Sequence, residues 1–303
     1  MSDKETQDSQ SEVATDEETF SRHLTESAML VRFRAKKWSG SKLDRATSRE
    51  VTIMKNAEDG SGWFTKSLVP SSIMRRIQRI QGEARVYHYE HSLPWEDGGA
   101  RLLPVDEYNG YSAQMRKFEV ALDEAKRLFM EHYDEVVAQA QTRLGDLFDP
   151  DDYPPRENFH HLIDIEWKVW PVPEGEHFVA NLAAHEVQVA REKITEEIAN
   201  RVRGGVESLF GRIRQAVESM QERLDDGPEE KMKIFRNTLT SNLRNACEMA
   251  SRLNITGDGQ LSDLIDEIHS ITDGLEADDL RSSTEKRKEV KGKMDDIMGG
   301  YFA

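Results

Sequence analysis

The segment from Gly145 to His161, GDLFDPDDYPPRENFHH, gathers four aspartates, three prolines and two adjacent histidines. Carboxylates and imidazoles are the groups that bind metal ions or transfer protons. A calcium loop, however, needs acids at alternating positions, a central glycine and a distal glutamate, and prolines occupy those places here. On a strand, His160 and His161 would point to opposite faces and would not share a metal. Asp-Pro and Tyr-Pro-Pro are turn sequences, so the segment is predicted to be a corner between a helix and a strand.

The remaining chemically capable residues form no recognisable site. His88 and Glu90 fall on one face of an extended segment and His91 on the other, and His132 is flanked by acids on a helix. The sequence contains no phosphate-binding loop, dinucleotide fingerprint, zinc-protease motif or nucleophile elbow. Cys247, the single cysteine, excludes an internal disulfide and predicts a small core residue. We therefore predict no catalytic residue, no metal ligand and no cofactor, and we do not expect an enzyme.

A basic stretch is the third candidate. Residues 29–85 carry 13 Lys/Arg against 5 Asp/Glu, while the rest of the chain carries 28 against 52 and the net charge is −16. Basic residues with interleaved aromatics can hold single-stranded nucleic acid by phosphate contacts and base stacking. The candidate residues for this are Arg32, Arg34, Lys36, Lys37, Trp38, Lys42, Arg45, Arg75, Arg76 and Arg79. The alternative, which we prefer, is that these charges neutralise acidic helices within the fold or across an oligomer.

The ends and the hydropathy of the chain indicate its class. Residues 1–20 are polar and acidic, and they are predicted to form a disordered tail. The N-terminus lacks the basic and apolar regions of a secretory signal, and no apolar run approaches the length of a membrane span. We expect a cytoplasmic protein without membrane association.

Hydrophobic periodicity predicts the elements that position these residues. Long apolar stripes at steps of three and four predict helices over 72–86, 112–148, 179–224, 229–253, 261–275 and 278–298. Alternation and β-branched runs predict strands at 29–33, 51–53 and 158–172, with an extended segment at 87–91. The expected fold is α+β: a small antiparallel sheet and long amphipathic helices in residues 21–178, followed by an elongated region of antiparallel helical hairpins in residues 179–303.

Four landmarks in the chain resemble a known family. They are KKWSGSKLDRATSREV, ARVYHYEHSLPWEDGGARLLP, LGDLFDPDDYPPRENF and WKVWPVPEGEHF, and they extend over roughly residues 28–225. In order and spacing they resemble an uncharacterised family of phage and mobile-element proteins, known only as a domain of unknown function. Some members lie near genes for MoxR-type AAA+ ATPases, which implies an adaptor or assembly role. The family has no established catalytic residues, so the resemblance assigns none.

We expect a non-enzymatic, phage-type accessory protein that acts by protein–protein interaction and self-assembly, as an oligomer in the bacterial host cell. One alternative is a nucleic-acid-binding accessory protein of phage replication or recombination, which would use the basic stretch. Another is a host-defence antagonist whose acidic surface occupies a basic host site.

Overall fold

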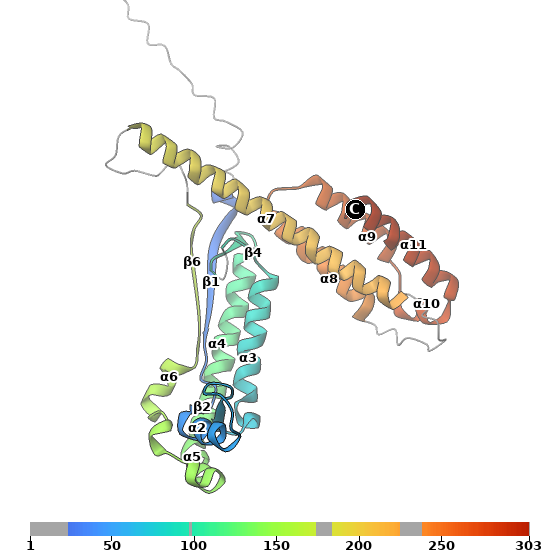
Figure 1. The fold of residues 1–303 in the computed structure, drawn as a ribbon. Helices are drawn as coiled ribbons and strands as arrows, with labels where there is room; N and C mark the ends of the chain where they lie inside the picture. The colour runs from blue at the N-terminus through green and yellow to red at the C-terminus, as the bar shows by residue number, and fades with distance from the viewer. Residues whose placement is uncertain (1–23, 97–98, 174–183, 225–237, 303) are drawn as a thin grey trace, which may run out of the picture. The chain divides into compact units, whose positions relative to one another are not determined.

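The computed structural model describes residues 24–96, 99–173, 184–224 and 238–302 (Figure 1). The described residues divide into two compact units. Unit 1 comprises residues 24–31, 91–107 and 169–302, and unit 2 comprises 32–90 and 108–168. This division differs from the predicted boundary near residue 178, because the chain passes between the units several times. The predicted disordered tail, residues 1–20, lies outside the described residues.

A small antiparallel sheet has the strand order β4-β5-β1-β6, and strands β2 and β3 form a separate hairpin. In unit 1, β1 pairs with β5 from Ala28 opposite Pro104 to Val31 opposite Arg101. Long helices make up most of the remaining chain, which confirms the predicted α+β class. The four strands of the larger sheet are β1 (Ala28–Lys36), β4 (Leu93–Pro94), β5 (Arg101–Pro104) and β6 (Asp164–Pro171).

Unit 2 is built around two packed helices, α3 (Ser71–Glu90) and α4 (Tyr108–Glu131). On α3 the buried row Ile77, Ile80, Ala84 and His88 recurs at steps of three and four, and α4 contributes buried residues such as Met115. The prediction of an extended segment at 87–91 was therefore wrong for residues 87–90, because the helical row of buried residues continues through His88.

The predicted helix 112–148 is interrupted at His132, and α5 (Tyr133–Leu144) follows. Three short 3₁₀ turns and α6 (Phe159–Leu162) then lead to β6, so the proline-rich segment is the predicted corner. The strand predicted over 158–172 was wrong before residue 164: Phe159 and Ile163, both buried, lie one helical turn apart. The 3₁₀ turns are η1 (Gly145–Leu147), η2 (Pro150–Asp152) and η3 (Arg156–Asn158).

Unit 1 is dominated by α7 (Ala184–Leu224), a 41-residue helix about 60 Å long at 1.5 Å per residue. Its buried stripe runs from Ile198 to Leu224 and packs on α8 and α11. Where β4 approaches α7, a Cβ added to Gly205 would lie 3.4 Å from Leu93 Cδ1, so a methyl group would touch Leu93 and the atoms of a larger side chain would have to displace it. The other helices of the unit are α8 (Thr238–Leu253), α9 (Gly259–Thr272), α10 (Ala277–Ser282) and α11 (Thr284–Tyr301).

Candidate functional site

A small module of unit 2, residues 41–67, contains the candidate site. Strands β2 (Ser41–Asp44) and β3 (Phe64–Ser67) pair in antiparallel register, and α2 (Arg45–Met54) lies between them in sequence. Asp44 Oδ1 caps α2 by accepting a hydrogen bond from Thr47 N at 2.9 Å. Ser48 Oγ donates to Asp44 O at 2.6 Å and accepts from Phe64 N at 2.9 Å. These bonds hold the helix against the hairpin, and we call residues 41–67 the α2 module.

Val51–Ile53, predicted as a strand, lies in the second half of α2. The prediction was wrong because the Asp44 cap starts a helix that continues through these β-branched residues. In a helix, successive residues turn by about 100°, so the three side chains point in different directions. Thr52 faces inward with Ser48, and the two apolar side chains face solvent.

The α2 module is rich in exposed apolar side chains. Eleven large apolar side chains are exposed in the described part of the chain, and five of them belong to this module. Ile53, Met54 and Trp63 have the largest exposed fractions of the five, at 75%, 73% and 69%. Exposed apolar side chains that gather on one small module make that module a candidate binding surface. We call the five residues the apolar patch: Leu43, Val51, Ile53, Met54 and Trp63.

A surface pocket of about 250 Å³ lies within the module. Leu43 and Trp63 provide apolar walls, and Arg45 and Arg49, one helical turn apart on α2, provide positive charge. Neither guanidinium is paired with a carboxylate of the described residues. Asp59 is the one carboxylate among the lining residues. The full lining is Leu43, Arg45, Ser48, Arg49, Thr52, Asp59, Gly60, Gly62 and Trp63.

Beside the patch, buried charges fix the hairpin to the proline-rich corner. Lys66 Nζ lies 2.5 Å from Asp152 Oδ2 and 3.6 Å from Asp44 Oδ2, and it donates to Leu147 O at 2.8 Å. Lys42 pairs with the other oxygen of Asp152. The side chain of Asp152 is 1% exposed and that of Lys66 7%. The acidic corner therefore anchors the α2 module.

The electrostatics of this anchor favour the charged forms of both partners. Burial opposes ionisation of Asp152, but hydrogen bonds from Lys42 and Lys66 outweigh it and hold the pKa of the carboxyl below its ordinary value. Burial likewise acts against the charged form of Lys66, and the hydrogen bond and charge of Asp152 raise the pKa of the ammonium above its ordinary value. Each charge is thus retained because the other is present.

The structure disperses the residues predicted to contact nucleic acid. Trp38 is half-buried, with its ring centroid 4.9 Å from Phe159 in an edge arrangement and 6.3 Å from Phe129. Its indole therefore packs against core aromatics. Lys36 pairs with Glu166, and Lys42 with Asp152, so two of the predicted cations already have anionic partners.

The other predicted cations are exposed: two lie on β1, one directly after it, one on α2 and three on α3. Arg79 Nε lies 3.5 Å from Glu83 one turn further along α3. Arg45, at the pocket, is the predicted residue that lies beside an exposed indole, that of Trp63. Sequence reasoning did not select Arg49. It lies four residues after Arg45, and this spacing places the two side chains on one face only if residues 45–54 form a helix. The remaining exposed residues of the set are Arg32, Arg34, Lys37, Arg75 and Arg76.

The other groups considered from sequence lie in structural roles. His88 is buried, with Nδ1 2.8 Å from the Tyr111 hydroxyl and its ring stacked 5.4 Å from Phe33. Cys247 is fully buried in the core of unit 1, and burial raises the pKa of its thiol to about 12. Within the residues that the structure describes, no group of three or more His, Cys, Asp or Glu is arranged to hold a metal ion.

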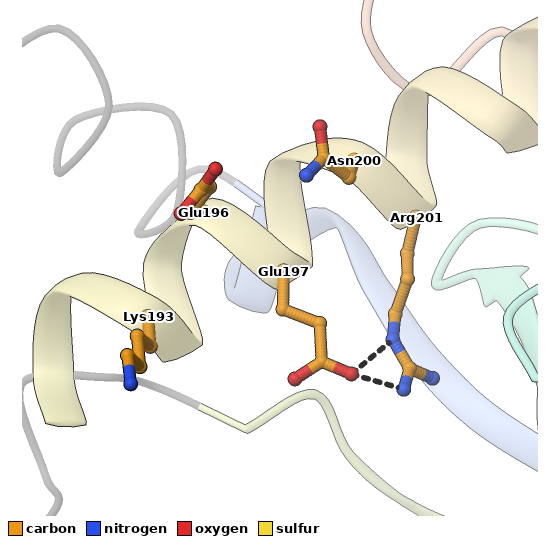
Figure 2. Close-up of a pocket in the computed structure, with 5 residues that line it drawn as sticks. All are labelled: Lys193, Glu196, Glu197, Asn200 and Arg201. Atoms are coloured by element: carbon orange, nitrogen blue, oxygen red, sulfur yellow. Dashed lines mark hydrogen bonds and ion pairs between the residues drawn. The ribbon is translucent and has the colours of Figure 1, made fainter.

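A second hollow lies along α7 in unit 1. Figure 2 shows Lys193, Glu197 and Arg201 on one side of the helix and Glu196 and Asn200 on the other. Arg201 bonds with Glu197, donates to Trp95 O at 2.8 Å, and lies over the Trp95 ring at 5.4 Å. Its cation is therefore used to hold the β4–β5 hairpin, and all the lining residues belong to one helix. We assign this hollow a structural role.

Comparisons with protein-family models, with curated proteins and with solved structures found no match. Among the described helices, none combines the length and the apolar character that crossing a membrane requires.

Proposed function

We propose that this chain is an accessory protein that works by binding another protein through the apolar patch of the α2 module. The observation that carries the proposal is the concentration of exposed Leu43, Val51, Ile53, Met54 and Trp63 within residues 43–63. Together with the resemblance noted for residues 28–225, the proposal describes a phage-type accessory protein with no reaction of its own.

The composition of the surface supports a protein partner. Trp, Met and Arg are enriched at protein interfaces, and Trp and Arg are the commonest residues whose truncation strongly weakens binding. The same small module supplies all three types, as Trp63, Met54 and the pair Arg45 and Arg49. Burying exposed apolar side chains is favourable by about 25 cal/mol per Å². The anchor formed by Lys66 and Asp152 keeps the module in place, so little ordering would be needed on binding.

Affinity capture tests this proposal. Tagged chain would be recovered from its native cells with and without nuclease, and co-purifying proteins identified by mass spectrometry. The test variant is Ile53→Ser with Met54→Ser, and the matched control is Val120→Ser, which changes an exposed apolar residue (69%) on α4. We expect a nuclease-resistant partner that the double variant loses and Val120→Ser retains. A partner set identical in all three proteins would reject the patch as the binding surface.

One observation favours the nucleic-acid alternative. Among the five tryptophans, all of them described, only Trp63 is exposed, and it lines a pocket with two unpaired arginines. An indole beside guanidinium groups can stack a base and contact its phosphate. Loss of the captured partners on nuclease treatment, together with steep weakening by salt, would favour this function over protein binding.

A further inference from the structure

The pocket of the α2 module has a defined chemical preference. Arg45 and Arg49 carry charge that no described carboxylate neutralises, and Leu43 and Trp63 present apolar surface to the same space. Guanidinium groups bind carboxylates through paired hydrogen bonds. A complementary ligand would place carboxylates within two or three residues of a bulky apolar side chain.

The chain itself contains such a segment. Residues 16–20 read DEETF, with three consecutive acids followed closely by Phe20. Residues 1–23 hold seven acidic and two basic residues, and Phe20 is their one aromatic residue. This segment lies outside the described residues. Its charge is opposite to that of the arginine pair, and its single ring matches the apolar side of the pocket.

We propose that residues 16–20 of one copy bind the pocket of a second copy, with Glu17 and Glu18 against Arg45 and Arg49 and Phe20 against Trp63. The inference rests on the proposed function, because the pocket shares Leu43 and Trp63 with the apolar patch and the partner is named as a second copy of this chain. The two surfaces differ, so copies associate either by reciprocal exchange in a closed dimer or head to tail in larger rings or filaments. The carboxylate of Asp59 in the pocket opposes the acidic segment and weakens the contact.

Sedimentation velocity of the full chain over a range of concentrations tests the inference. The wild type should form concentration-dependent oligomers. Arg45→Glu with Arg49→Glu should weaken self-association by at least about 10-fold, as expected when interfacial arginines of high energetic weight are reversed. Glu17→Lys with Glu18→Lys should weaken it similarly. Asp59→Asn should strengthen it, since it removes the carboxylate that lines the pocket.

A mixing experiment and a control variant test whether the two named segments bind each other. The two reversed proteins, mixed in equal amounts, should associate again because each supplies a complement to the other. Arg75→Glu with Arg76→Glu is the matched control: it reverses two exposed arginines of α3 in the same unit and should leave association unchanged.

Three results would overturn the inference. They are a strict monomer at every concentration, oligomers that neither charge reversal affects, and reversed proteins that do not associate when mixed. If the wild type is a monomer and the Ile53→Ser, Met54→Ser variant nevertheless loses a captured partner, self-binding is rejected and the proposed function is retained. The proposed function itself would be rejected if the Ile53→Ser, Met54→Ser variant captured the same partners as the wild type.

Discussion

Replacing Asp152 with alanine tests whether the proline-rich corner anchors the α2 module. Asp152 is the partner of both Lys66 and Lys42, and its side chain is 1% exposed. The substitution removes the acid and leaves Lys66, itself 7% exposed, in a buried position. An uncompensated buried ammonium is destabilising because it has lost water without gaining an opposite charge.

The magnitude follows from the partners that remain. Breaking a buried ion pair from one side costs about 3–5 kcal/mol when nothing replaces the lost partner. Lys66 would keep the Leu147 carbonyl at 2.8 Å and Asp44 at 3.6 Å, and Lys42, 53% exposed, would return to water. We therefore expect a smaller loss, about 2–3 kcal/mol of local stability.

Hydrogen–deuterium exchange of the β2 and β3 amides measures this loss locally, which suits a chain with two units. At 1.4 kcal/mol per factor of ten, exchange should accelerate by about 30- to 150-fold. Asp151→Ala is the control, because Asp151 is exposed and its loss should stay within about 0.5 kcal/mol. Equal exchange in the Asp151 and Asp152 variants would refute the idea that the buried pair anchors the module.

Three further predictions concern the same anchor and the core of unit 1. The pKa of Asp152 is lowered in the folded chain, so its stabilising effect is present above the unfolded pKa of about 4 and is lost as the pH falls through the folded-state pKa. Amide exchange in β2 and β3, corrected for intrinsic rates, should therefore rise below about pH 4 in the wild type. In Asp152→Ala it should change little. Gly205→Leu should cost about 1–3 kcal/mol, read as a lowered Tm, because its side chain meets Leu93, whereas Gly211→Leu has open space and should be tolerated. Cys247 should react with thiol reagents at pH 8 far more slowly in the native than in the unfolded chain, because it is buried and its thiol pKa is about 12.

The helices were predictable where apolar residues recur at a single period over many turns. Met115, Leu122 and Phe129 are buried on α4 as their spacing requires, and Ile198 and Val202 are buried on α7. Short segments were not predictable, because five residues satisfy two periods at once. Tyr87–His91 fits an alternating strand as well as the end of a helix, and the preceding buried row of α3 decides for helix.

The candidate site was only partly accessible from sequence. Arg45 was identified from its basic neighbourhood, but the exposure of Ile53 and Met54 depends on how α2 packs on its hairpin. Trp38 and Trp63 both lie within the basic stretch of residues 29–85, so composition alone does not separate them. The structure separates them: Trp38 packs against Phe129 and Phe159, and Trp63 is exposed. Contacts between residues that are distant in sequence make this distinction, and local composition does not reveal such contacts.

The positive charge of residues 29–85 is largely balanced within its own unit. Residues 32–90 carry 13 basic and 6 acidic residues, and residues 108–168 carry 7 and 13, so unit 2 is close to neutral. Lys36 with Glu166 and Lys66 with Asp152 are pairs across these two segments. This supports the interpretation that the basic stretch mainly neutralises acids of the same fold.

That balance predicts how binding should depend on salt. A partner that uses the apolar patch meets two cations, Arg45 and Arg49, that pair with no described carboxylate, and it gains most of its affinity from apolar contact. A single strand of nucleic acid contacting roughly six basic residues would instead lose affinity with a slope near −4 in log K against log salt. We expect a slope shallower than about −2 for the captured partner, measured by titration at several salt concentrations. A steep slope that Arg75→Glu with Arg76→Glu reduces would show that the exposed cations of α3 bind the partner, and the patch would not be the principal binding surface.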